Sequence, residues 1–325
     1  MKAKSTLFAL YVALSAGAVL GGCGYIAVET APAKQAAGSR TDAAVEADAL
    51  FWQTLHAGQY DEISTALQAL TGAYLANPND AVTAAHVGWM HIWRLAERAR
   101  LDVVPATITD EAILARRYFQ EAVNLNPHEP RYLGFLGAAM LAEGSIHKDE
   151  KLTRRGHYLL LDAIDAWPEF NLFTAGYVAS GQPVDSKQFK QALQWQWQNL
   201  DVCVNAKVDR TDPNFARYMT METTEGHKRV CWNSWIAPHN FEGFFLNMGD
   251  MLVKAGDWQT ARKIYANAKL PATYARWKSR DVLEERIAAA QGNVAVFNGP
   301  APGADKSRQR MMAASPFACV ACHQQ

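Results

Sequence analysis

Two cysteines and a histidine near the C-terminus have the spacing that holds a covalently bound haem. The residues are Cys319, Cys322 and His323, in the order Cys-Val-Ala-Cys-His. In this arrangement the two thiols form thioethers with the vinyl groups of the porphyrin, and the imidazole beside the second cysteine coordinates the iron. We therefore expect one covalent haem c, attached through Cys319 and Cys322, with His323 as the proximal iron ligand.

The pentapeptide resembles the haem-attachment site of the c-type cytochromes, in which a Met or His further along the chain usually supplies the second axial ligand. Only Gln324 and Gln325 follow His323, so the second ligand is expected upstream. Two other chemistries use the same cysteine spacing, namely a dithiol redox pair and half of a zinc site. A dithiol pair normally begins a helix after a strand, and zinc normally needs a fourth ligand. Neither context is evident here.

Candidates for the second iron ligand form two groups. Met311 and Met312 precede Cys319 by eight and seven residues, and they reach the iron if the chain folds back over the porphyrin. Alternatively, a linker of about 25 residues lets the haem dock elsewhere on the protein. The candidates in that case are Met219, Met221, His227 and His239. For each of them an ordinary surface or packing role is the alternative. An iron with an open sixth position would instead suit a peroxidase or a sensor.

The N-terminus has the pattern of a secretion signal that ends in a lipid-attachment cysteine. Two lysines precede an apolar segment, residues 7–19, which is too short to span a bilayer comfortably. The sequence Leu20-Gly21-Gly22-Cys23 resembles the lipobox of bacterial lipoproteins. This resemblance implies that residues 1–22 are a signal peptide and that Cys23 carries lipid and anchors a periplasm-facing protein. Because Gly24 follows Cys23, the resemblance favours attachment to the outer membrane over the inner one. An ordinary signal peptide with an incidental cysteine is the alternative.

The two remaining cysteines, Cys203 and Cys231, would lie in a compartment that permits disulfides. A bond between them would close a loop of about 29 residues and contribute roughly 3.5 kcal/mol. Two buried thiols are the alternative.

The chain has 32 basic and 32 acidic residues and no basic run, which argues against nucleic acid as a partner. Phosphate-binding and hydrolase motifs are not evident, so an electron carrier or a binding protein is favoured over a catalyst.

Apolar periodicity predicts an all-α protein. Residues 23–44 are rich in Ala, Gly, Pro, Lys and Thr and are expected to be a flexible tether. Residues 45–292 have apolar side chains at spacings of three and four, interrupted by an irregular insert at 205–242. The insert is too long for an ordinary connection, which indicates a functional loop. Residues 293–325 contain a Gly- and Pro-rich stretch and are expected to be a linker and a flexible haem-bearing tail.

A pattern within the helical region resembles the tetratricopeptide repeat. In its clearest copy Gly249 is followed at twelve, sixteen and nineteen residues by Ala261, Tyr265 and Ala268. Small residues let two antiparallel helices pack closely, and the aromatic ring fills the gap between successive pairs. Weaker copies contain Gly88, Gly137 and Gly176. The resemblance implies a solenoid of roughly four helical hairpins.

These features together predict a membrane-anchored, periplasm-facing c-type haem lipoprotein. The array would bind a redox partner protein, and the tethered haem would exchange electrons with it. The alternative is a scaffold lipoprotein of the cell envelope, in which the array binds an assembly partner and the haem is a structural or sensory element.

Overall fold

The computed structural model describes residues 24, 26–232, 239–300 and 309–324. The chain divides into two units, residues 1–35 and 36–325. In the first unit, residues 26–29 form a helical turn that is closed by Thr30, whose amide and hydroxyl donate to the Ile26 carbonyl oxygen at 2.9 and 2.7 Å. In the second unit the described residues are helical and include no strand. The predicted all-α class is confirmed.

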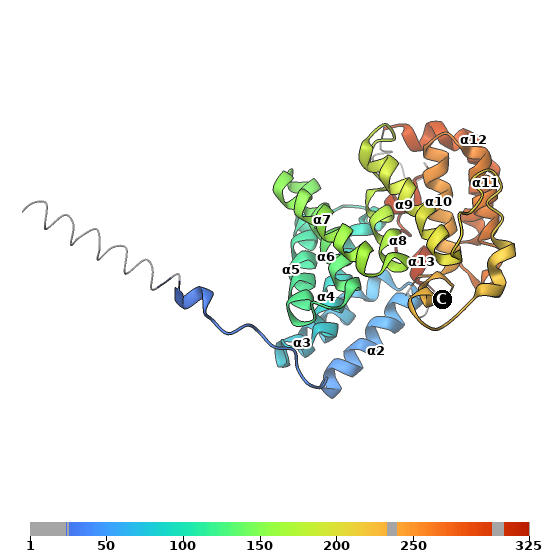
Figure 1. Ribbon diagram of the computed structural model, residues 1–325. Helices are drawn as coiled ribbons and strands as arrows, with labels where there is room; N and C mark the ends of the chain where they lie inside the picture. The colour runs from blue at the N-terminus through green and yellow to red at the C-terminus, as the bar shows by residue number, and fades with distance from the viewer. Residues whose placement is uncertain (1–23, 25, 233–238, 301–308, 325) are drawn as a thin grey trace, which may run out of the picture. The chain divides into compact units, whose positions relative to one another are not determined.

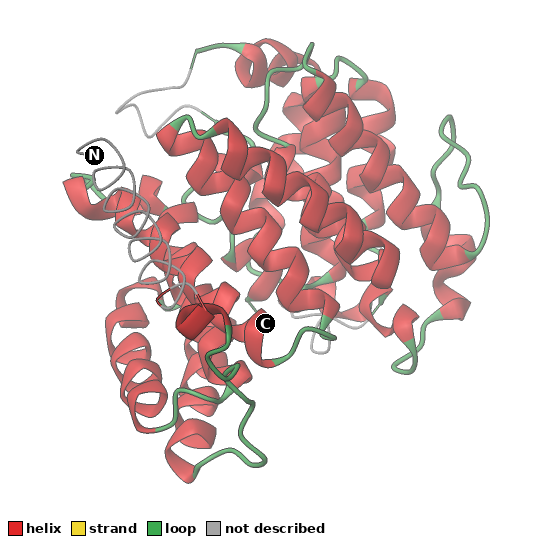
Figure 2. Ribbon diagram, turned by 60° about the vertical axis from the view of Figure 1, so that its left-hand side comes forward, coloured by secondary structure: helices red, strands yellow, loops and turns green. Residues whose placement is uncertain are grey.

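The helices of the second unit pack in neighbouring pairs (Figures 1 and 2). Each pair also contacts the next one along the chain. The pairs are α2 (Asp42–Ala57) with α3 (Ile63–Ala76), α4 (Ala81–Ala96) with α5 (Asp110–Leu125), α6 (Pro130–His147) with α7 (Glu150–Ala166), α8 (Pro168–Ala179) with α9 (Lys187–Val204), and α10 (Phe241–Lys254) with α11 (Trp258–Asn267); α12 (Arg280–Asn298) follows.

Glycines of the repeat pattern lie where two helices approach most closely. A Cβ atom at Gly137 of α6 would lie 2.9 Å from the carbonyl oxygen of Gly156 in α7, and a Cβ at Gly249 of α10 would collide with the Tyr265 ring of α11. Larger side chains at these positions would push the paired helices apart. The repeat pattern therefore correctly located two helix–helix contacts.

Helix α4 begins at a capped residue and carries Glu97 at its other end. The Asp80 carboxylate accepts the amides of Val82 and Thr83 at 3.0 and 3.3 Å and the Arg40 Nε at 2.9 Å. Burial alone would raise the pKa of Asp80, but the hydrogen bonds from Arg40 and Thr83 outweigh burial and lower it. The cap therefore fixes the start of α4 through an ionised side chain.

The described part of the predicted insert, residues 205–232 and 239–242, lies mostly between α9 and α10. It contains two short 3-10 helices, η4 (Phe215–Met221) and η5 (His227–Cys231). A further 3-10 helix, η6 (Ala272–Arg276), connects α11 and α12. Helix α12 continues to Asn298, six residues beyond the predicted end of the helical region, because Phe297 is buried in the adjacent core. Residues 293–298, which were predicted to begin a linker, therefore belong to α12.

The C-terminal segment, residues 309–324, joins two parts of the core. One hydrophobic cluster lies among α2, α3 and α4 and includes Cys319 and Val320. Another lies among α8 to α12 and includes Met312, Ala321 and Cys322. The short helix α13 (Val320–His323) contacts both α2 and α10 (Figure 1). The expectation of a flexible tail is wrong for these residues, because apolar side chains on both sides of the segment are buried by the array.

Candidate functional site

The Cys319–His323 motif forms one helical turn. The amides of Cys322 and His323 both donate to the carbonyl oxygen of Cys319, each at 3.0 Å. Cys319 belongs to the hydrophobic cluster of α2 to α4, and Cys322 belongs to the cluster of α8 to α12. The residues Cys319, Cys322 and His323 are 5%, 3% and 4% exposed. The motif is thus preformed and buried.

Glu97, which follows α4, holds the first residues of α13. One carboxylate oxygen, Oε1, accepts the amides of Cys319 and Val320 at 2.8 and 2.9 Å. The other, Oε2, accepts the Nε of Arg100 at 2.6 Å. Glu97 is fully buried. Amides at the start of a helix have no partner within the helix, and this side chain satisfies two of them from a distant part of the chain.

Side chains from other helices hold the carbonyl groups of the same segment. Asn240 donates its side-chain amide to the Ala321 oxygen at 2.9 Å and its backbone amide to the Cys322 oxygen at 2.7 Å. Trp277 donates its indole N–H to the same Ala321 oxygen at 2.8 Å. The Tyr177 hydroxyl donates to the oxygen of Ala318 at 3.0 Å. The segment is therefore fixed through its backbone as well as through apolar packing.

The ring of His323 lies between a tryptophan and a second histidine. Its centroid is 5.0 Å from that of Trp89 on α4 and 5.0 Å from that of His239, which immediately precedes the N-cap of α10. Phe173 and Phe170 of α8 contact the His239 ring at 4.7 and 5.8 Å. Of the candidate second ligands, His239 is therefore placed beside His323.

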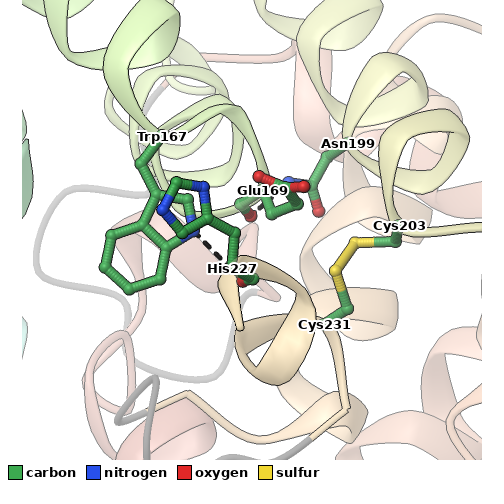
Figure 3. The surroundings of a disulfide bond; sticks show 6 residues. All are labelled: Trp167, Glu169, Asn199, Cys203, His227 and Cys231. Atoms are coloured by element: carbon green, nitrogen blue, oxygen red, sulfur yellow. Dashed lines mark hydrogen bonds between the residues drawn. A yellow bond between two sulfur atoms is a disulfide. The ribbon is translucent and has the colours of Figure 1, made fainter. Parts of the chain in front are cut away.

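The other candidate ligands lie in different surroundings. Met311 and Met312 are buried in the hydrophobic cluster of α8 to α12, and the Met312 amide donates to the Asp250 carboxylate at 2.7 Å. His227 is exposed and stacks on Trp167 at 5.0 Å (Figure 3). Met219 is partly buried, and Met221 is 38% exposed on η4.

Cys203 and Cys231 form a disulfide that ties η5 to the end of α9 (Figure 3). Their Cα atoms are 5.8 Å apart. In the same region the Trp167 indole N–H donates to the backbone oxygen of His227 at 3.1 Å. The disulfide and this hydrogen bond fix η5 against the array.

Burial controls the ionisation of the two motif thiols. Desolvation raises the pKa of Cys319 well above its usual range, and the nearby Glu97 carboxylate adds to the effect. Desolvation likewise raises the pKa of Cys322, with a further contribution from Glu242. A reactive thiol must ionise easily. The dithiol redox alternative is therefore disfavoured while the segment is packed as described.

The two thiols and the two imidazoles are donors of the types that a covalent haem uses. Gly243 leaves room for a sulfur atom, since a Cβ at this position would lie 2.5 Å from the Cys322 Sγ. Two imidazoles that share one metal ion have ring centroids roughly 6 Å apart, given metal–nitrogen bonds of about 2 Å. The rings of His323 and His239, at 5.0 Å, need to separate by about 1 Å to bind one iron between them.

Hollows lie near both rings of the histidine pair. A hollow of about 40 Å³ is lined by His239 and Phe170, and a larger one of about 210 Å³ is lined by Trp89 and Phe170. Both hollows are smaller than the 300–1,000 Å³ that is usual for ligand pockets, and Phe170 belongs to both linings.

Other predicted features fall outside these contacts. Cys23, the signal peptide and the lipobox lie outside the described residues. Among the residues that the structure does describe, no helix is long and apolar enough to cross a membrane. The same part of the chain contains no group of three or more His, Cys, Asp or Glu side chains arranged to hold a metal ion.

Comparison with other proteins gives no family assignment: no protein-family model, no curated protein and no solved structure matches the chain. Function must therefore be inferred from the chemistry of the site, since a fold alone does not determine it.

Glu97 is the residue of the site that the sequence interpretation missed. It follows directly on the apolar helix Ala81–Ala96. A carboxylate is unfavourable at a helix C-terminus because the helix dipole is negative there. That mismatch was a signal of a partner elsewhere in the chain, but the sequence did not show that the partner was the α13 backbone.

Proposed function

We propose that this chain is a periplasm-facing lipoprotein that carries one covalent haem c and transfers electrons. Cys319 and Cys322 bind the porphyrin, His323 is the proximal ligand and His239 is the distal ligand. The observation that supports the proposal most directly is the 5.0 Å separation of the two imidazoles. It places a histidine from the irregular insert against the histidine of the attachment motif.

Bound haem with two histidine ligands supplies reversible one-electron chemistry. The residues of this chain orient the ligands and exclude water from them. Trp89 packs against His323 and Phe173 packs against His239, at centroid distances of 5.0 and 4.7 Å. Exclusion of water would disfavour the more highly charged oxidised iron, so a haem held here would have a higher reduction potential than a water-exposed one.

The helical pairs would form a tetratricopeptide-like solenoid that binds a redox partner protein. In contrast to a haem on a free tail, the haem would be held within the array, because residues 309–324 pack between α2 and α10. Cys23 would carry the lipid that anchors the protein to the outer membrane, or to the inner one.

A scaffold function is the second candidate, and one observation favours it. The C-terminal segment contributes Cys319 to the cluster of α2 to α4 and Cys322 to the cluster of α8 to α12. A haem attached to both cysteines would then brace the array, and the array would bind an assembly partner without electron transfer.

The proposal is tested by producing the exported full-length protein together with the cytochrome c maturation machinery. We expect intact mass and the absorption spectrum of the pyridine complex to show one covalent haem, which is lost in Cys319→Ser/Cys322→Ser. The wild-type iron should be six-coordinate and low-spin. His239→Ala should make it five-coordinate, whereas the control His227→Ala, which alters an exposed ring stacked on Trp167, should leave it unchanged.

A wild-type protein without covalent haem would overturn the proposal. If haem is attached, potentiometry separates the two candidates. If the iron can be reduced and reoxidised reversibly while it keeps both histidine ligands, electron transfer is supported. If the iron does not cycle reversibly between its two oxidation states, and Cys319→Ser/Cys322→Ser unfolds at a lower urea concentration than wild type, the scaffold function is supported.

A further inference from the structure

The cavity of about 210 Å³ lies among the first four helical pairs. Its wall is formed by side chains of α2, α4, α6 and α8, which are the first helices of those pairs. Neither the Cys319–His323 turn nor His239 lines it. The cavity is therefore a feature of the array itself, and its chemistry is separate from that of the haem-attachment motif.

The size of the cavity limits what it can hold. A cavity of about 150 Å³ in a protein core accommodates one benzene molecule, whereas larger ligands occupy pockets of about 300–1,000 Å³. At about 210 Å³, this cavity has room for a single aromatic ring with small substituents.

Aromatic side chains form much of the wall. Phe51 and Trp52 of α2 have ring centroids 4.8 Å apart, and Trp89 of α4 and Phe135 of α6 have centroids 4.9 Å apart. Both pairs pack edge to face, the arrangement that aromatic rings prefer. A further planar ring can pack against such a wall in the same way.

Two polar side chains of the wall have atoms that can bond to a ligand. The Nδ1 of His86 lies 2.5 Å from Asp48, which places the proton of the neutral imidazole on Nδ1 and leaves Nε2 as an acceptor. The Tyr132 hydroxyl has no hydrogen-bond partner among the described residues. Burial raises the pKa of Tyr132 to about 12, so this hydroxyl stays protonated and can donate.

The charged side chains of the wall are already paired. Asp48 is engaged by His86 and by Arg40, which is 3.5 Å away. Arg131 donates from Nε and one terminal nitrogen to Glu129, each at 2.8 Å. A charged ligand would lose its hydration here without meeting an unpaired counter-charge, which is unfavourable. The wall therefore favours an uncharged ligand.

We propose that the cavity is a binding site for small uncharged phenols, the class that includes phenol and hydroquinone. A hydroxyl of the ligand donates to Nε2 of His86, and an oxygen of the ligand accepts from the Tyr132 hydroxyl. The ring packs among the aromatic side chains. This inference goes beyond the proposed haem function and does not depend on it.

The test measures binding to the full-length protein by isothermal titration calorimetry at neutral pH. The probes are phenol, hydroquinone, anisole, toluene, benzoate and benzylamine. Toluene is similar in size to phenol but forms no such hydrogen bonds, so phenol and hydroquinone should bind about tenfold more tightly than toluene. Anisole can accept but cannot donate to His86, so it should bind more weakly than phenol. The ionised probes benzoate and benzylamine should also bind more weakly.

Four variants locate the site. Tyr132→Phe removes only the donor and should weaken hydroquinone binding about tenfold without changing toluene binding. Tyr158→Phe is the matched control, because Tyr158 is 65% exposed on α7. Val82→Phe adds a ring at a half-buried position of the wall and should abolish binding of every probe. Cys319→Ser/Cys322→Ser should bind like wild type, since neither cysteine lines the cavity. Circular dichroism checks that each variant is folded.

Selective one-to-one binding of phenol and hydroquinone, weakened in Tyr132→Phe and lost in Val82→Phe, supports the inference. Absence of saturable binding would overturn it, as would binding of toluene, anisole or an ionised probe that is as tight as that of phenol. Unchanged binding in folded Val82→Phe would place the site elsewhere and would also overturn it. If Tyr132→Phe folds poorly, the ranking of probes on wild type and the Val82→Phe result still decide. A negative result leaves the proposed haem function untouched.

Discussion

Glu97 should control how firmly the C-terminal segment is docked. In Glu97→Ala the buried amides of Cys319 and Val320 lose their shared acceptor. Each unsatisfied buried amide costs about 1–3 kcal/mol, and removal of the buried carboxylate offsets part of this cost. We expect docking to weaken by about 2–4 kcal/mol, which raises the population of the undocked segment roughly 30- to 700-fold. Glu97→Gln keeps one acceptor oxygen and should have a smaller effect.

The assay is thiol labelling with Ellman's reagent on haem-free full-length protein that carries Cys23→Ser. Among the described residues Cys319 and Cys322 are the free cysteines and both are buried, so labelling reports undocking. Glu150→Ala is the control, since Glu150 and its partner Arg154 are 72% and 73% exposed and such pairs contribute at most about 1 kcal/mol. If the thiols of folded Glu97→Ala are labelled at a rate within about fivefold of the wild-type rate, Glu97 does not hold the C-terminal segment in place.

Three further changes test other contacts. Gly243→Ala places a Cβ 2.5 Å from the Cys322 Sγ, so docking should weaken by about 1–3 kcal/mol; unchanged Cys322 labelling would contradict this packing. Replacement of Cys203 and Cys231 by alanine removes a link across 28 residues and should lower the unfolding free energy by about 3.5 kcal/mol; urea denaturation checks this, and an unchanged midpoint would count against the bond. The lowered pKa of Asp80 means that its contribution to stability is present above the unfolded pKa of about 3.9 and is lost as the pH falls through the folded pKa. Asp80→Asn keeps a cap and should therefore flatten the decline of stability below about pH 4, as measured by urea titrations at several pH values; an equally steep decline would show that the carboxylate is not the cause.

Local sequence patterns were sufficient for the helical pairs. Gly137 and Gly249 occur at positions where a second helix approaches within contact distance, and that requirement is visible as a small residue within an apolar period. The link between Cys203 and Cys231 was predicted because the other three cysteines had been assigned to lipid and haem, with two buried thiols left as the alternative. The structure places these two cysteines in a disulfide.

The docking of the C-terminal segment was not predictable in this way. The hydrogen bond from Cys319 to Glu97 joins residues 222 positions apart, and that from Asn240 to Ala321 spans 81. Periodicity reports which face of an element is buried, but it does not identify a partner at such separations. The Gly- and Pro-rich stretch after α12 also suggested that the chain beyond it was independent of the array. For the same reason Met311 and Met312 were predicted as iron ligands, although they are buried in the hydrophobic cluster of α8 to α12.

The burial of the motif constrains the order in which a haem protein of this design can form. In the docked segment Cys319 and Cys322 are 5% and 3% exposed, and burial raises the pKa of both thiols. Sulfur reacts most readily as a thiolate that its reaction partner can reach, so neither condition is met once α13 is in place. If haem is attached at these cysteines, attachment must therefore precede docking of residues 309–324. In that case the hydrogen bonds from Glu97 and Asn240 would form around a segment that already carried its cofactor, and packing of the segment against α2 and α10 would follow haem attachment.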